Sequence, residues 1–210
     1  MRIPRLHLLQ PLPLEQTITL EAAASHYVGK VLRMQEKQEI ILFNDLSEQV
    51  SAHIVSLSKK SVSVFVSAPV AGPPPSSLHT HLGQVMSRGE RMDFAIQKAT
   101  ELGVDEITPL FSRRCEVKLD HHRQAKRVAH WQQIAISACE QSGRIDVPRI
   151  HSPQTLSHWF DSTQAEAKLV LHPHQTNPLA LHVAPASCAL LIGPEGGLTQ
   201  QEVEQAYTHG

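Results

Sequence analysis

The sequence predicts an α/β protein in which a small β-rich domain precedes a larger domain built on a parallel sheet. Strand-like and helix-like segments alternate through residues 78–210, which is typical of βαβ units. Short apolar stretches dominate residues 1–70. Residues 68–77, which lie between these parts, contain four prolines, one glycine and two serines. This composition disfavours regular structure, so we place a linker at residues 71–77.

The first domain is expected to be a small barrel. Residues 40–43 and 53–55 are strand candidates, and residues 62–66 alternate valine with serine or phenylalanine, the pattern of a strand with one buried face. One helix is expected at residues 21–32, where three consecutive alanines favour it. Several short strands with one helix therefore predict a compact barrel for residues 1–70.

The second domain is expected to open with a βαβ unit. A strand over residues 78–86 precedes Ser87 and Glu90, which have the spacing of a capping box and predict a helix start. Met92 and Ile96 share one face of that helix, and a strand follows at residues 106–110. The unit predicts a parallel sheet.

Two further strands and two helices continue this alternation. A long helix is expected over residues 123–142, and strands are expected at residues 168–172 and 188–192. A last helix has a clear start, because Thr199 and Glu202 form the T-x-x-E capping box.

The chain is organised around the segment that joins the last predicted strand to the last predicted helix. Three glycines and one proline occupy residues 193–197, a density greater than a simple turn requires. A glycine-rich loop at the carboxyl end of a parallel strand usually binds a ligand. The segment has neither G-K-[ST] nor G-x-G-x-x-G, so it matches neither common phosphate-binding loop.

Composition restricts the other classes. The formal net charge is −1, so a nucleic-acid surface would have to be local. The sequence has no apolar run long enough to span a membrane and no signal-peptide pattern, and its three scattered cysteines suit a reducing compartment. We therefore expect a cytoplasmic protein with no membrane partner.

Basic residues gather in one window between residues 113 and 127. They are Arg113, Arg114, Lys118, Arg123, Lys126 and Arg127. The window is compatible with RNA contact and equally with ordinary surface charge near a helix start. The basic residues of the first domain leave the same two interpretations open. Glu140 and Arg144 flank Gly143, an arrangement that suits either a polar pocket or a routine helix end.

Fourteen histidines raise the question of a metal. His79 with His81, and His172 with His174, form H-x-H pairs, which would support a metal-dependent enzyme as an alternative. The pattern is weak without C-x-x-C, H-E-x-x-H or an acidic cluster, so we expect no metal site. The sequence has no G-x-S-x-G motif, which disfavours a hydrolase of that type.

Five motifs in this order resemble the RsmE family of 16S ribosomal RNA methyltransferases over essentially the whole chain. They are Met1-Arg-Ile-Pro-Arg5, His26-Tyr-Val-Gly-Lys-Val-Leu-Arg33, Gln97-Lys-Ala-Thr-Glu-Leu-Gly103, Glu140-Gln-Ser-Gly-Arg144 and Leu191-Ile-Gly-Pro-Glu-Gly-Gly197. The resemblance implies a PUA-like RNA-binding barrel at residues 1–70 and a SPOUT methyltransferase domain with a trefoil knot at residues 78–210. It also implies a homodimer that methylates N3 of a uridine in the small ribosomal subunit.

The resemblance implies S-adenosylmethionine as cofactor and the following site. Residues expected to bind the cofactor are Leu171, His172, Leu191, Ile192, Gly193, Pro194, Glu195, Gly196 and Gly197. Residues expected to contact RNA are Arg2, Arg5, His26, Lys30, Arg33, Arg88, Arg113, Arg114 and Lys118. Arg144 is the candidate for stabilising negative charge on the uracil, and Glu140 or Glu195 for accepting the N3 proton.

The resemblance also implies a further C-terminal segment. RsmE-like chains continue past the position of Gly210 with a strand, a loop and a helix that close the knot and contribute to the cofactor pocket and the dimer. We therefore expect residues 78–210 to lack that segment. The alternatives to this function are a non-catalytic RNA-binding protein and a SPOUT methyltransferase that acts on another RNA.

Overall fold

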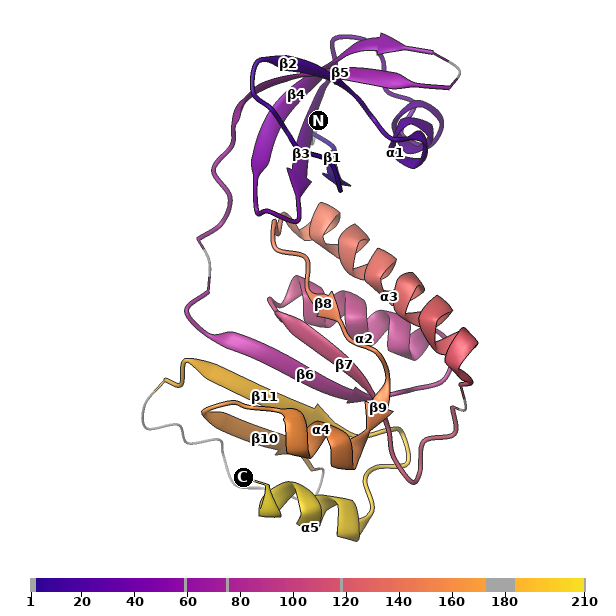
Figure 1. The fold of residues 1–210 in the computed structure, drawn as a ribbon, viewed down its shortest axis with the longest axis vertical. Helices are drawn as coiled ribbons and strands as arrows, with labels where there is room; N and C mark the ends of the chain where they lie inside the picture. Colours follow the sequence, from indigo (N-terminus) through magenta and orange to yellow (C-terminus); the bar gives the residue numbers. More distant parts are fainter. Residues whose placement is uncertain (1–2, 59, 75, 118, 173–183, 210) are drawn as a thin grey trace. The chain divides into compact units, whose positions relative to one another are not determined.

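The computed structural model describes residues 3–58, 60–74, 76–117, 119–172 and 184–209 (Figure 1). The chain divides into two compact units, Met1–Pro74 with Cys139–Val147, and Pro75–Ala138 with Pro148–Gly210. The division falls inside the expected linker, and the first unit also includes a short segment from the second half of the chain. Within the described residues, no helix combines the length and the apolar composition needed to cross a membrane.

The first unit is built on a five-stranded sheet. In spatial order the strands are β1 (Arg5–Leu8), β3 (Glu39–Asn44), β4 (Gln49–Leu57), β5 (Val62–Pro69) and β2 (Gln16–Thr19). β1 pairs with β3 in parallel, and the other neighbouring pairs are antiparallel. The three strands predicted from sequence are confirmed. The four-residue strands β1 and β2 were missed because so short a segment carries little periodicity.

The core of the first unit follows the predicted alternation. Val62, Val64 and Val66 are buried, and Ile54 lies opposite Val64 in the β4–β5 pair. Leu42 of β3 is fully buried in the same cluster. The apolar face of the sheet therefore forms one continuous core.

The helix expected at residues 21–32 is present but changes its winding. Ala22–His26 forms α1, and Tyr27–Val31 continues as a π-helical turn, η1, in which the amide of Leu32 donates to the carbonyl of Tyr27. Such wide turns are rare and often occur at functional positions.

The second unit is an all-parallel sheet. Its spatial order is β10 (Ala167–Leu171), β11 (Ser187–Ile192), β6 (His79–Val85), β7 (Glu106–Phe111) and β8 (Arg149–Ile150), and β9 (Gln154–Thr155) pairs with a later part of β7. The predicted parallel sheet is confirmed. β8, β9 and the helix α4 (Leu156–Ser162) were not predicted.

The other helices are α2 (Glu90–Glu101), α3 (His121–Ser142) and α5 (Gln200–Thr208). All of α2 and α5 and most of α3 belong to the second unit, and the last turn of α3, from Cys139, belongs to the first. The predicted capping box at Ser87 and Glu90 is wrong. Gly89 occupies the N-cap with a φ of 58° and no side-chain cap, so Glu90 is the first helical residue rather than the third. The capping box of Thr199 and Glu202 at α5 is confirmed.

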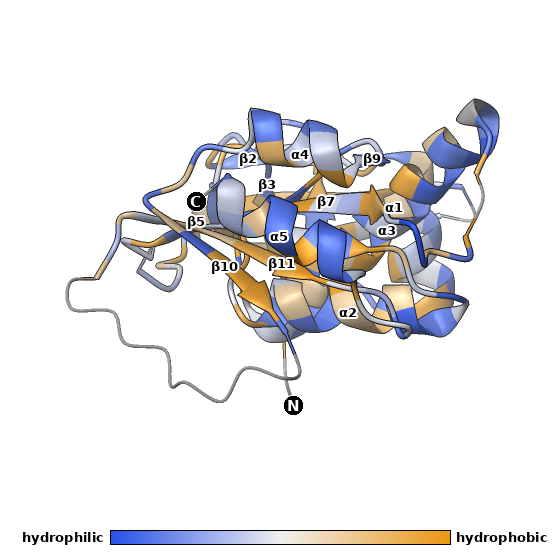
Figure 2. Ribbon diagram, turned by 90° about the horizontal axis from the view of Figure 1, so that it is seen from below, coloured by the Kyte–Doolittle hydropathy of each residue, from blue (hydrophilic) through white to orange (hydrophobic). Residues whose placement is uncertain are grey.

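A bulky aromatic side chain covers the centre of the sheet. Trp159 and Phe160 of α4 pack with Leu110 of β7 and Leu191 of β11 in one buried cluster. In Figure 2, α4 and α2 lie on opposite sides of the sheet, and β10 and β11 carry mainly hydrophobic colours. Gly83 of β6 admits the Trp159 ring, because a Cβ built at this glycine would lie 2.7 Å from it and 2.9 Å from Leu110.

We predict that Gly83→Ala destabilises the protein by about 1–3 kcal/mol, since the added methyl overpacks the core between two large side chains. Urea unfolding followed by circular dichroism measures the effect. Gly196→Ala is the matched control in the same unit, because its new Cβ would lie 3.8 Å from Arg114, an ordinary contact distance. Equal stabilities for the two variants would contradict the assignment of Gly83 to close packing.

Candidate functional site

The strand order creates a crevice at one edge of the parallel sheet. From β6 the chain passes through α2 to β7 on one side, whereas β11 pairs with β6 on the other side. Ile192 pairs with Gln84 and with Leu171, so the carboxyl ends of β6, β10 and β11 meet at the same edge. Ligands of open α/β sheets bind at this kind of switch point.

The glycine-rich loop at this edge is a tight turn. The Gly197 amide donates to the Pro194 carbonyl at 2.8 Å, and Gly197 has a φ of 69°, a conformation that favours glycine. A Cβ on Gly193 would lie 3.3 Å from the backbone nitrogen of Leu198. Two of the three glycines are therefore required by the turn itself.

The loop encloses a pocket of about 370 Å³, a volume suited to a small-molecule ligand. We call it the loop pocket. Its lining residues are Arg114, Leu171, His172, Ile192, Gly193, Pro194, Glu195, Gly196, Gly197 and Leu198. Every residue that we expected to bind the cofactor lines this pocket except Leu191. The Leu191 side chain is only 2% exposed and packs into the core beneath α4.

One buried carboxylate connects this loop to the segment after β7. Glu202 accepts hydrogen bonds from the backbone amides of Arg113 and Thr199, both at 2.8 Å, and from the Thr199 hydroxyl at 2.9 Å. Burial alone would raise the pKa of Glu202. Together, the hydrogen bonds from the Arg113 and Thr199 backbones and from the Thr199 hydroxyl outweigh the effect of burial, so the pKa of Glu202 is lowered.

A second, strongly basic pocket of about 850 Å³ adjoins the loop. We call it the arginine pocket. Its lining residues are Arg88, Gly89, Arg91, Arg113, Arg114, Cys115, Glu116, Glu195 and Gly196. Arg88, Arg113 and Arg114 were expected from the sequence to contact RNA, and Arg91 was missed because it lies alone in the first turn of α2.

Contacts with neighbouring groups hold three of these arginines. Arg114 donates from Nη1 to the Gly196 carbonyl at 2.8 Å, and Arg88 pairs with Glu116 at 2.7 Å. Arg91 donates to Glu195 at 3.0 Å. A hydrogen bond from its own backbone, together with those from Arg91 and Arg88, holds the pKa of Glu195 below its usual value.

The other two candidate catalytic residues belong to the first unit. Glu140 accepts a hydrogen bond from the backbone amide of His7 at 3.1 Å, and burial raises the pKa of its carboxyl despite that bond. The Arg144 carbonyl accepts from Arg5 Nη2 at 2.9 Å. Arg5 also bonds Gln49 and lies 4.9 Å from the centre of the Phe43 ring, so its guanidinium takes part in packing within this unit.

The remaining residues expected to contact RNA divide as follows. His26, Lys30 and Arg33 are exposed, and the first two line a pocket of about 410 Å³ with Lys60. Arg2 and Lys118 lie outside the described residues. The structure thus gathers basic side chains at two places, one in each unit.

The two H-x-H pairs lie in different places. His79 and His81 are near the amino end of β6, at the opposite edge of the sheet from the glycine loop. Burial lowers the pKa of His81 to about 4, so its imidazole is neutral at physiological pH. His172 lines the loop pocket, and His174 lies outside the described residues.

Comparison with protein families identifies both parts of the chain. Residues 74–210 match the RNA methyltransferase domain family, and residues 20–67 match the RNA methyltransferase PUA domain family. Both matches agree with the α/β and PUA-like fold class expected from the sequence.

Two relatives that match over most of this chain carry the same name. The chain is 36% identical over its whole length to ribosomal RNA small subunit methyltransferase E of Buchnera aphidicola from Schizaphis graminum, covering 86% of that protein. It is 29% identical to the Bacillus subtilis protein of the same name, with 90% of this chain and 78% of that protein covered.

Solved structures agree with these relatives. A methyltransferase from Legionella pneumophila in complex with SAM superposes with a TM-score of 0.93 at 36% identity, covering all of this chain and 87% of that one. The ribosomal RNA small subunit methyltransferase E of Neisseria gonorrhoeae, bound to S-adenosyl methionine, gives 0.92 at 34% identity, covering all of this chain and 86% of that one.

We predict that Glu202→Gln lowers the free energy of unfolding at pH 7 by about 1–3 kcal/mol, because it weakens bonds to buried amides. Since folding lowers this pKa, the stabilisation is present above the ordinary value of 4.5 and is lost as the pH falls through the folded value. The variant should therefore lose less stability than the wild type between pH 6 and pH 3. Urea titrations at each pH measure this.

Glu204→Gln is the matched control, since Glu204 is an exposed glutamate on the same helix. Its effect should stay within about 0.5 kcal/mol. If Glu202→Gln lost as much free energy of unfolding between pH 6 and pH 3 as the wild type does, the role of the buried carboxylate would be refuted.

Proposed function

Because the chain belongs to the ribosomal RNA small subunit methyltransferase E family, we propose that it methylates N3 of a uridine in the 16S rRNA of the small ribosomal subunit with S-adenosylmethionine as methyl donor. The observation that carries this proposal is the loop pocket directly beside the arginine pocket, with Arg114, Glu195 and Gly196 lining both. A cofactor-sized pocket next to a cationic surface suits an enzyme that modifies a polyanion.

The loop pocket fits this cofactor in its chemistry. Its walls combine the backbone of Gly193–Gly197 with the apolar side chains of Leu171, Ile192 and Leu198. Backbone groups can pair with an adenine edge and ribose hydroxyls, and the apolar walls can enclose the base. S-adenosylmethionine, when bound, supplies an electrophilic methyl group. Its adenosine lacks phosphates, which agrees with a loop that matches neither phosphate-binding motif.

The protein must make the uridine nucleophilic. N3 of uracil carries a proton and becomes a good nucleophile as that proton leaves, so the base must be oriented and the proton accepted. We assign to Arg144 the stabilisation of negative charge that develops on the uracil carbonyls. Because the reacting base must leave any stack, the RNA is expected to present it unpaired.

Between the two candidate proton acceptors we favour Glu140. A general base works best when its pKa approaches the working pH. Burial raises the pKa of Glu140, whereas hydrogen bonds lower that of Glu195, which also pairs with Arg91. We therefore assign proton acceptance to Glu140 and assign to Glu195 the positioning of Arg91 beside the loop.

The two basic surfaces are proposed to hold the RNA. Arg88, Arg91 and Arg113 in the arginine pocket would contact phosphates near the reacting base. His26, Lys30 and Lys60 beside η1 would contact a second part of the RNA, which is the role we propose for the first unit. Since the proposed substrate is a ribosomal subunit, we also propose the cytoplasm as the site of action.

We predict that the protein forms N3-methyluridine when it is incubated with unmodified small ribosomal subunits and S-adenosylmethionine. Nuclease digestion and mass spectrometry identify the base. Arg144→Ala should lower kcat by about 10²–10³-fold because it removes a charge that acts in the transition state. Its affinity for S-adenosylmethionine, measured by calorimetry, should be unchanged.

Arg149→Ala is the matched control, because Arg149 is an exposed arginine of β8 outside both pockets. Cofactor binding without any methylated base would favour a non-catalytic relative. Methylation of free RNA but not of the subunit would favour another RNA substrate. Unchanged turnover by Arg144→Ala on saturating subunits would remove this arginine from the mechanism.

We further propose that the active form is a homodimer, as the resemblance to the family implies. The expected result is a solution mass of twice the 23.3 kDa chain by light scattering. The measurement should span concentrations above and below those of the methylation assay. A mass of one chain at concentrations that support methylation would contradict the dimer and leave the reaction itself intact.

A further inference from the structure

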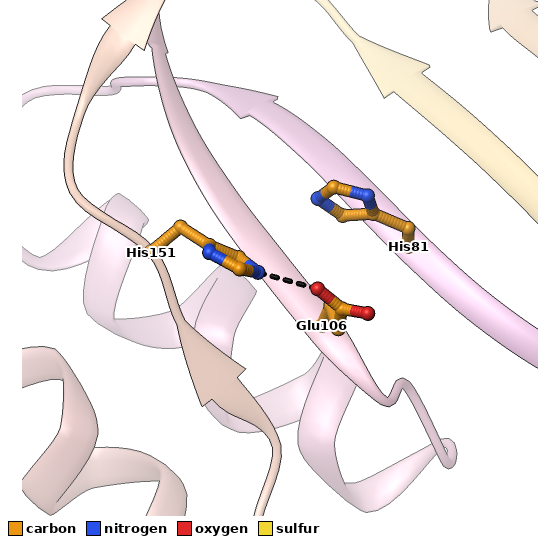
Figure 3. Close-up of side chains that lie close together, drawn as sticks. All are labelled: His81, Glu106 and His151. Carbon is orange, nitrogen blue, oxygen red and sulfur yellow. Dashed lines mark hydrogen bonds and ion pairs between the residues drawn. The ribbon is translucent and has the colours of Figure 1, made fainter. Parts of the chain in front are cut away.

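We propose that His81, Glu106 and His151 form a binding site for one divalent transition-metal ion of the zinc class. The three side chains come from three separate segments of the second unit. His81 lies on β6, Glu106 begins β7, and His151 directly follows β8 (Figure 3). In Figure 3 the two imidazole rings flank the carboxylate of Glu106.

The potential ligand atoms already lie close together. One atom from each of the three residues lies within 4.8 Å of the other two, and Nε2 of His151 is 2.5 Å from Oε2 of Glu106. A tetrahedral ion with bonds of about 2.0–2.1 Å to nitrogen holds its ligand atoms roughly 3.3 Å apart. Small side-chain rotations around a bound ion would produce that geometry.

The ligand types select the class of ion. Two imidazole nitrogens with one carboxylate oxygen suit zinc and its neighbours, whereas magnesium and calcium prefer oxygen ligands throughout. Zinc sites with three protein ligands keep a fourth position for water. All three side chains are half-buried, so an ion could enter and a water could remain.

Neighbouring groups orient the three side chains, as is usual around metal ligands. His79 contacts the other carboxylate oxygen of Glu106 at 2.9 Å. Thr108 Oγ1 lies 2.7 Å from Nε2 of His81, and the Trp159 indole nitrogen lies 3.4 Å from the same atom. The last contact gives the site an internal fluorescent reporter.

The position of the cluster indicates a structural role. Glu106 pairs with His81 and with Arg149 in the sheet, near the amino ends of β6 and β7. The glycine loop follows the carboxyl end of β11 at the opposite edge. An ion here would join β6, β7 and the segment after β8 without entering the proposed methyl-transfer site.

A hydrogen-bonded cluster without metal is the competing interpretation, because Glu106 contacts His79 and His151 directly. Metal binding separates the two. Full-length protein, stripped with a chelator and then dialysed, should bind one equivalent of Zn²⁺ in calorimetry. Co²⁺ should quench part of the tryptophan fluorescence through Trp159. Zn²⁺ should also raise Tm, since an ion that binds only the folded state stabilises it.

His151→Gln and His81→Gln should each weaken Zn²⁺ binding by at least about tenfold. Removing a residue that only hydrogen-bonds to a metal ligand already causes a loss of about this size. His130→Gln is the matched control, because His130 also pairs with a carboxylate, Asp93 at 2.9 Å, away from the cluster. It should bind Zn²⁺ like the wild type. Glu106→Gln tests the third ligand while keeping the size of the side chain.

Three results would overturn the proposal. They are the absence of a stoichiometric Zn²⁺ site in the wild type, equal affinity in wild type and His151→Gln, and equal losses in His151→Gln and His130→Gln. Circular dichroism and S-adenosylmethionine binding by each variant establish that it is folded. A loss of Zn²⁺ binding by a folded variant is then specific to the cluster.

Discussion

The Glu202 carboxylate is the interaction on which the candidate site depends. Glu202 is the third residue of α5, and the amides of Thr199 and Arg113 both donate to its carboxylate. Thr199 lies two residues after the last glycine of the loop, and Arg113 lies in the segment that carries Arg114. One buried anion therefore ties the end of the glycine loop to the segment that carries Arg114. An exposed carboxylate could not do so, because water would compete for the same donors.

Strand order then decides which segments can meet. β11 inserts between β6 and the strand that precedes it in sequence, β10, so loops from distant parts of the sequence share one edge. The glycines of the loop allow Leu198 to approach Gly193 closely, which keeps the turn compact. The strand order thus determines where the pocket lies, and the backbone conformation of the loop determines its shape.

Local signals explain what could be predicted from the sequence. The capping box at Thr199 and Glu202 is confirmed. It could be predicted because its bonds join residues only three apart in the sequence. At α2 a similar pattern failed, because Gly89 adopts a positive φ and takes the cap position. The bond from Arg113 to Glu202 and the approach of His151 to Glu106 span 89 and 45 residues. No periodicity or motif encodes such pairs. The loop pocket was therefore predictable, whereas the bond that ties its loop to Arg113 and the histidine cluster at the opposite edge were not.

The first unit has a consequence for how the chain matures on the ribosome. The amide of His7 in the first strand finds its acceptor in Glu140, 133 residues later, and Arg5 bonds the carbonyl of Arg144. Translation supplies the amino-terminal sheet long before it supplies these partners. The amino-terminal sheet therefore acquires its last native contacts only when α3 has emerged, and a chain released before that point carries a sheet with open positions. Premature termination between residues 75 and 138 would thus leave both units incomplete.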